Sequence, residues 1–184
     1  MLMSASTQEF RELFPKFTSL LDTSAIESFV SAANEVTYSK GSTIILENTI
    51  SNKLFFLLEG TLNAYIEKNG KRINLGETPP GSIIGEVSFF GDCPTTATVG
   101  ANTDCKMFVL GKAEFGKLQT EVPQFASQLL RTTSIMLTTR LHNTDKKLCQ
   151  GFIDQETDPQ TNIIPGLVVL YTNIYKLMHG HTEV

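Results

Sequence analysis

A carboxylate and a turn suited to backbone contacts come together in the segment Pro80–Val99. Gly85 precedes Glu86, and glycine permits a close approach between the backbone and a ligand. A short helix starting near Val87 would leave its first N–H groups unpaired and pointing outward, where they favour an anion. Glu86 could accept hydrogen bonds from hydroxyl groups. The pattern suits a ligand with a phosphate and a sugar hydroxyl, but a plain turn capped by Glu86 fits the same residues.

The remaining reactive residues do not suggest catalysis or a metal site. The sequence contains no Ser/His/Asp or Cys/His arrangement, carboxylate pair or phosphate-binding P-loop, so we expect no enzyme. Cys93, Cys105 and Cys149 are an odd number without CxxC spacing, which predicts reduced thiols. Cys93 inside the segment could sense redox state or bind haem, although a single cysteine is more often inert. His179 and His181 stand near the end of a predicted tail, and we expect no metal there.

The elements that must position the segment are mainly strands. From Val36 to Leu110, short runs of β-branched and aromatic residues alternate with turn residues every eight to twelve positions. This spacing predicts about eight antiparallel strands in a closed barrel or sandwich. Asn69-Gly70 is the strongest turn signal, because both residues tolerate the positive φ of a type I′ hairpin. Residues 7–34 have helical periodicity, with Ser24 as the predicted cap of their second helix.

Helical periodicity returns after the strands. A short helix is predicted over Ala113–Leu118 and a long one over Pro123–Gln150, where Pro123 suits a first turn. The apolar side of the long helix could form a dimer seam or pack on its own barrel, and the pattern fits both. Gly151–Thr161 is predicted to be a linker, and Gly166–Met178 a last helix.

The segment resembles the phosphate-binding cassette of cyclic-nucleotide-binding domains. Its order is Gly-Glu-apolar-small-aromatic, followed by Pro-x-Thr-Ala-Thr-Val at residues 94–99. Such domains occur in the catabolite activator family, protein kinase A regulatory subunits and cyclic-nucleotide-gated channels. Lys40-Gly41, Phe55–Gly60 and Pro80-Gly81 also match the family's barrel layout, so the resemblance covers roughly residues 10–148.

The resemblance implies a fold and a division of the chain. The fold would be mainly β, an antiparallel double-stranded β-helix, or jelly-roll-like barrel, with N-terminal helices and a long C-terminal helix. Residues 1–35 would form the N-terminal helices. Residues 36–150 would form the barrel and the long helix, and residues 151–184 the linker and C-terminal helix.

The resemblance also implies a role for each cassette residue. Gly85 and Glu86 would contact the ribose of cyclic AMP or cyclic GMP, with Glu86 accepting from the 2′-hydroxyl. Backbone groups of Val87 and Ser88 would face the phosphate. The residue after Pro94 should be an arginine that pairs with the phosphate.

Thr95 stands where that arginine is expected. Such a charge-assisted pair contributes about 1.5–3 kcal/mol, so its loss would weaken a site by roughly one to two decades. We therefore expect a regulatory module with weak, altered or lost cyclic nucleotide binding, acting through dimerisation or a protein partner. The alternative is a genuine cyclic AMP or cyclic GMP sensor. In it, Thr95, Thr96, backbone amides and Arg140 of the long helix would hold the phosphate, or another small anion would bind.

Composition restricts the remaining partners. The 184 residues carry a net charge of −4 and no Lys/Arg cluster, which argues against nucleic acid or an anionic membrane. Residues 151–184 contain Lys176 as their only Lys or Arg, so we expect no DNA-binding helix-turn-helix there. The apolar stretch Ile163–Leu170 is too short to span a bilayer, and residues 1–10 lack the pattern of a signal peptide. These features predict a cytoplasmic protein.

Overall fold

The structure is a computed structural model that describes residues 4–156. It divides after Ser134 into two compact units, the second of which begins at Ile135. In the described part of the first unit, the elements in chain order are α1 (Ala5–Leu13), α2 (Pro15–Thr18), α3 (Thr23–Ala32), β1 (Asn34–Tyr38), β2 (Thr43–Ile45), β3 (Lys53–Glu59), β4 (Leu62–Lys68), β5 (Lys71–Thr78), β6 (Ile83–Ile84), α4 (Glu86–Gly91), β7 (Thr98–Ala101), β8 (Cys105–Gly111) and α5 (Lys112–Glu121). Helix α6 (Pro123–Glu156) begins in this unit and continues in the second.

The strands of the described chain form two four-stranded antiparallel sheets, in the orders β1-β8-β3-β6 and β2-β7-β4-β5. Strand β3 is buried without interruption from Leu54 to Leu58. Phe55 and Leu57 face the barrel core, whereas Phe56 on the opposite side contacts the N-terminal helices. The predicted fold class, a mainly β barrel with flanking helices, is confirmed.

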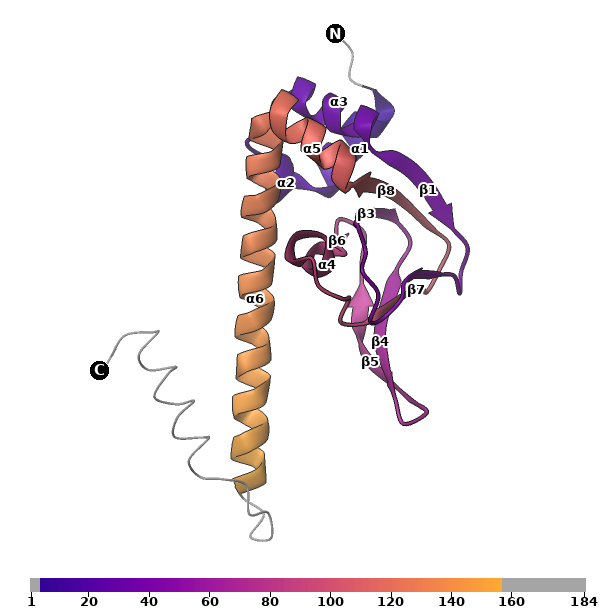
Figure 1. The fold of residues 1–184 in the computed structure, drawn as a ribbon, viewed down its shortest axis with the longest axis vertical. Coiled ribbons are helices and arrows are strands. Elements are labelled where there is room, and N and C mark those ends of the chain that lie inside the picture. The colour runs from indigo at the N-terminus through magenta and orange to yellow at the C-terminus, as the bar shows by residue number, and fades with distance from the viewer. Residues whose placement is uncertain (1–3, 157–184) are drawn as a thin grey trace, which may run out of the picture. The chain divides into compact units, whose positions relative to one another are not determined.

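The hairpin between β4 and β5 follows its sequence signal. Asn69 and Gly70 have φ values of 54° and 70°, and the register pairs Lys68 with Lys71 across a two-residue turn. Helices α1, α3 and α5 lie at one end of the barrel, and this hairpin projects from the other end (Figure 1). The N-terminal helices therefore do not cover the end of the barrel from which the hairpin projects.

Phenylalanines join the helices to the barrel. Seven of those in the described chain form the group that we call the aromatic cluster, and all of them are at most 4% exposed. Phe29 stacks on Phe125 of α6 with ring centroids 4.9 Å apart and meets Phe56 of β3 edge-on at 4.9 Å. The members are Phe10, Phe14, Phe17, Phe29, Phe56, Phe108 and Phe125.

A lysine on β8 joins three elements by charge. Lys106 Nζ lies 3.2 Å from Glu9 of α1, 3.8 Å from Glu35 of β1 and 3.8 Å from Glu59 of β3. Partial burial opposes the charged form of Lys106. The hydrogen bond to Glu9 and the charges of the three carboxylates outweigh this effect and raise the pKa of Lys106.

Two element ends differ from the sequence prediction. The cap of α3 is Asp22 rather than Ser24, because the Asp22 carboxylate accepts from the Ala25 N–H at 2.8 Å. Ser24 instead donates its hydroxyl to Asp22 at 3.0 Å, and the bonds from Ala25 and Ser24 lower the pKa of Asp22. Helix α6 continues through Glu156, so residues 151–156, expected to begin a linker, are helical. The helix predicted over Gly166–Met178 lies outside the described residues, as do His179 and His181.

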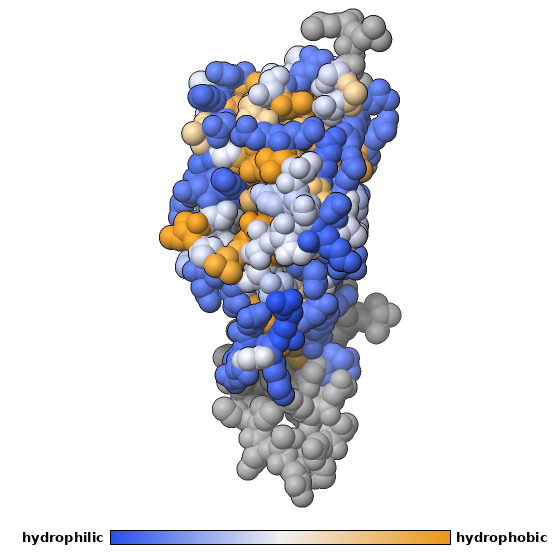
Figure 2. Space-filling view, turned by 90° about the vertical axis from the view of Figure 1, so that its right-hand side faces the viewer, coloured by the Kyte–Doolittle hydropathy of each residue, from blue (hydrophilic) through white to orange (hydrophobic). Residues whose placement is uncertain are grey.

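Hydrophilic residues cover most of the face shown in Figure 2, where apolar residues are exposed only in small groups. Within residues 4–156, no helix has both the length and the apolar character needed to cross a membrane.

Candidate functional site

The segment from Gly85 to Thr98, which we call the cassette, begins with a sharp turn between β6 and α4. Gly85 has φ 89°, and a Cβ atom there would lie 2.7 Å from the carbonyl oxygen of Lys53. Both the left-handed conformation and the close backbone approach require glycine. The turn places Glu86 in the first turn of α4, where a carboxylate interacts favourably with the helix dipole.

Two polar side chains of α4 are buried. Glu86 is 3% exposed and Ser88 is 1% exposed. The Ser88 hydroxyl accepts a hydrogen bond of 2.8 Å from the backbone N–H of Ser51, in the loop between β2 and β3. The Cys93 thiol donates to the carbonyl oxygen of Val87 at 3.6 Å, which connects the turn after α4 to the first turn of that helix.

Thr95 is bound to the same loop through its side chain and its backbone. Its hydroxyl donates to the carbonyl of Leu46 at 2.5 Å and accepts from the N–H of Thr49 at 3.2 Å. Its own N–H donates to the carbonyl of Thr49 at 2.8 Å, and its carbonyl accepts from the N–H of Asn48 at 2.9 Å. Thr95 is buried, whereas the neighbouring Thr96 is exposed.

Thr98 makes a third contact of this kind. Its buried hydroxyl accepts from the N–H of Glu47 at 3.1 Å. Within the cassette, three buried hydroxyls thus accept hydrogen bonds from alternate residues of the loop at positions 46–51.

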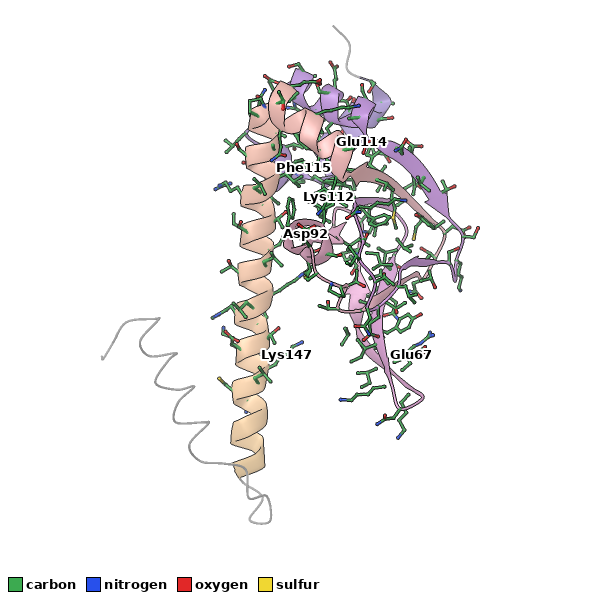
Figure 3. The ribbon with its side chains drawn as sticks, viewed as in Figure 1. Glu67, Asp92, Lys112, Glu114, Phe115 and Lys147 are labelled. Atoms are coloured by element: carbon green, nitrogen blue, oxygen red, sulfur yellow. The ribbon has the colours of Figure 1, made fainter. Side chains whose placement is uncertain are left out.

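Helix α4 also contacts α5. Phe115 lies against Phe89 and Phe90, with ring centroids 5.6 and 5.7 Å away. Lys112 at the start of α5 forms an ion pair with Asp92 at the end of α4, and the two side chains point toward one another in Figure 3. Helix α4 is therefore connected to α5 by both apolar and charged contacts.

The charges of the cassette itself are all negative. Residues 85–98 include Glu86 and Asp92 but no lysine or arginine. Among residues 4–156, no three His, Cys, Asp or Glu side chains converge in a way that could hold a metal ion.

Comparison with known proteins accounts for this combination of barrel and cassette. Residues 35–121 match the family model of the cyclic nucleotide-binding domain. These residues belong to that family. A cAMP-dependent protein kinase regulatory subunit from Colletotrichum orbiculare is 33% identical over 81 residues, which are 44% of this chain and 20% of the relative. Human cGMP-dependent protein kinase 2 is 27% identical over 125 residues, 66% of this chain and 16% of the kinase. The chain thus spans a fifth or less of the length of these two relatives.

Solved structures have the same fold. A cyclic nucleotide-binding domain from Methylobacillus flagellatus superposes with a TM-score of 0.69 at 18% identity, covering 77% of this chain and 83% of that one. The catabolite activator protein of Thermus thermophilus superposes with a TM-score of 0.63 at 20% identity, covering 72% and 61%. At these identities the likeness concerns the fold alone.

Most of the predicted site residues of this cyclic nucleotide-binding domain lie in one short segment. Arg140 is an exposed residue of α6 and belongs to the second unit, and its part in the site stays a prediction. Sequence reasoning missed the loop at positions 46–51, for which no local motif gives a signal. The residues within the cassette are Gly85, Glu86, Val87, Ser88, Thr95 and Thr96.

Proposed function

We propose that the chain acts as a regulatory module of the cyclic-nucleotide-binding type, whose pocket has diverged at the phosphate position. In this proposal the module is not an enzyme. It changes the surface that it presents to a second protein chain. The observation that carries the proposal is Thr95, an uncharged residue in a cassette that contains no cation. The relatives named for cyclic AMP- and cyclic GMP-dependent kinases support the regulatory class.

The electrostatics of the cassette favour weak or lost binding of cyclic nucleotides. Residues 85–98 offer a cyclic phosphate no lysine or arginine, and the nearby Lys112 of α5 is already paired with Asp92. Removal of an arginine–phosphate pair corresponds to roughly one to two decades in the dissociation constant.

Calorimetric titration with cyclic AMP and cyclic GMP tests this part. We expect a dissociation constant of about 10–100 μM or weaker, or no heat, because a site of about 1 μM loses one to two decades. Binding at about 1 μM would contradict the divergent pocket and favour the alternative, a genuine sensor in which Thr95, Thr96, backbone amides and Arg140 hold the phosphate. In that case Arg140→Ala should weaken binding, whereas Arg131→Ala, a matched change earlier on α6, should not.

The route from the cassette to the output would run through α5. Phe115 and Lys112 contact α4, and α5 leads directly into α6 at Pro123. A ligand that prefers one arrangement of α4 would shift the population of α6 arrangements accordingly.

The proposed output is a dimer formed along α6. Leu130, Leu137, Leu141 and Leu148 are exposed and follow one another at spacings of seven, four and seven residues, which is a heptad pattern. On the helical wheel, Arg140 and Lys147 border this seam on one side and Asp145 on the other. A parallel pair of copies places Arg140 opposite Asp145 of the other copy, whereas an antiparallel pair brings the basic side against itself.

Light scattering of Leu137→Glu/Leu141→Glu tests the seam. We expect wild type to be a dimer at tens of micromolar and this variant to be a monomer, because four buried carboxylates would repel one another. Ile135→Glu is the matched control, since Ile135 is equally exposed but lies on a different side of α6. A monomeric wild type would contradict dimerisation and leave a different protein as the partner.

A further inference from the structure

The loop at positions 46–51 is bound to the cassette along its whole length. Its alternate N–H groups donate to buried cassette hydroxyls, and the pairs are Glu47 with Thr98 at 3.1 Å, Thr49 with Thr95 at 3.2 Å, and Ser51 with Ser88 at 2.8 Å. The three hydroxyl-bearing residues are each at most 6% exposed. The donating N–H groups lie at a partly buried contact, where backbone donors need partners, and these hydroxyls supply them.

We infer that Ser88, Thr95 and Thr98 form a hydroxyl clasp that holds the loop against the cassette without a ligand. Thr95 is its central positioning residue. This inference deepens the proposed function, because Thr95 occupies the position at which the family's arginine would bind the cyclic phosphate. Thr95, which stands in place of that arginine, positions the loop instead of binding a ligand.

The bonding of Thr95 supports this role. A hydroxyl has one proton to donate, and that of Thr95 is given to the carbonyl of Leu46. The hydroxyl could donate to a phosphate only by releasing Leu46. Both backbone groups of Thr95 are also bonded to the loop, and Asn48, which donates to the Thr95 carbonyl, is in the left-handed conformation with φ 59°. The turn of the loop is thus built around Thr95.

An arginine at this position would change two things at once. It would add the missing charge, but it would also remove the hydroxyl that bonds Leu46 and Thr49. We therefore expect Thr95→Arg to release the loop, so that this substitution does not simply add a phosphate-binding charge.

Amide hydrogen exchange, followed by NMR on the nucleotide-free protein, tests the clasp residue by residue. In Thr95→Val, which keeps the shape but removes the hydroxyl, the Thr49 amide should exchange roughly five- to tenfold faster, as expected for one lost hydrogen bond. Thr95→Ser keeps the hydroxyl and should retain wild-type protection. Thr96→Val makes the same chemical change at the adjacent exposed residue and should have no effect on Thr49.

A second variant keeps the test informative if Thr95→Val does not fold. In Thr98→Val, the Glu47 amide should exchange faster in the same way. The inference is overturned if Thr49 and Glu47 keep wild-type protection in these variants, if Thr96→Val accelerates Thr49 equally, or if Thr95→Arg leaves Thr49 protected. None of these readings involves a nucleotide, so a failure of the proposed ligand chemistry is recognised separately by the calorimetric titration.

Discussion

The aromatic cluster and the hydroxyl clasp both attach surrounding segments to the barrel, but they do so by different physical means. The cluster buries large apolar rings, and its contribution depends on area rather than on the direction of any bond. The clasp consists of single hydrogen bonds, each with a net contribution of about 1 kcal/mol but with strict geometric demands. We therefore expect the cluster to contribute most of the stability and the clasp to fix the geometry of the cassette.

The largest effect is expected from Phe56→Ala. Phe56 is fully buried and contacts several rings, including Phe10 and Phe29. Removal of such a ring leaves a cavity and should lower the free energy of unfolding by about 3–5 kcal/mol in chemical denaturation. Phe90→Ala, at a partly buried ring of the cassette, should lower it by less. Equal losses in the two variants would show that the rings of the cassette stabilise the fold as much as the aromatic cluster does.

A smaller effect is expected from Ser88→Ala. This change leaves the partly buried N–H of Ser51 without its partner and should lower the free energy of unfolding by about 0.5–1.5 kcal/mol. Thr96→Ala is the control at an exposed cassette hydroxyl and should change stability by less than about 0.5 kcal/mol. If Ser88→Ala were as stable as wild type, water would replace the lost hydrogen bond to Ser51 fully, and the clasp would not contribute to stability.

The smallest effect is expected from Lys106→Met, which tests whether charge supports the helical side of the barrel. The folded state raises the pKa of Lys106, so its contribution is complete below the pKa of the unfolded chain and disappears as the pH rises through the folded value. At neutral pH we expect a loss of at most about 1 kcal/mol, since the partners are partly exposed. The difference from wild type should vanish at strongly alkaline pH.

Denaturation of both proteins between neutral and alkaline pH measures this difference. Burial also raises the pKa of Tyr38, which gives a stability loss of the same sign at alkaline pH. The comparison is therefore made in a Tyr38→Phe background. A gap between the two proteins that widens with pH would show that the carboxylates around Lys106 are not its main partners.

The sequence predicts local structure well because local signals determine it. The turn spacing indicates the barrel, Asn69-Gly70 indicates the hairpin, and Gly85-Glu86 marks the start of the cassette. The cap of α3 is missed because Asp22 and Ser24 are both good capping residues and only the bond to Ala25 distinguishes them. Helix α6 passes Gly151 because one glycine weakens a helix by only about 1 kcal/mol.

The contacts of Thr95 could not be predicted from the sequence. Its identity as a departure from the family pattern is visible in the sequence, but its partners Leu46 and Thr49 lie 49 and 46 residues earlier. No periodicity or spacing rule relates a hydroxyl to backbone groups at such a distance. The loop reaches the cassette because β2 pairs with β7 and β3 pairs with β6.

The hydroxyl clasp contains no ionisable group. Ion pairs between exposed groups weaken as salt screens them, and paired carboxylates, lysines and histidines respond to pH. Hydrogen bonds between threonine or serine hydroxyls and backbone amides respond to neither. We therefore expect the clasp bonds to hold the loop equally firmly in dilute and in saline solution, and over a wide range of pH.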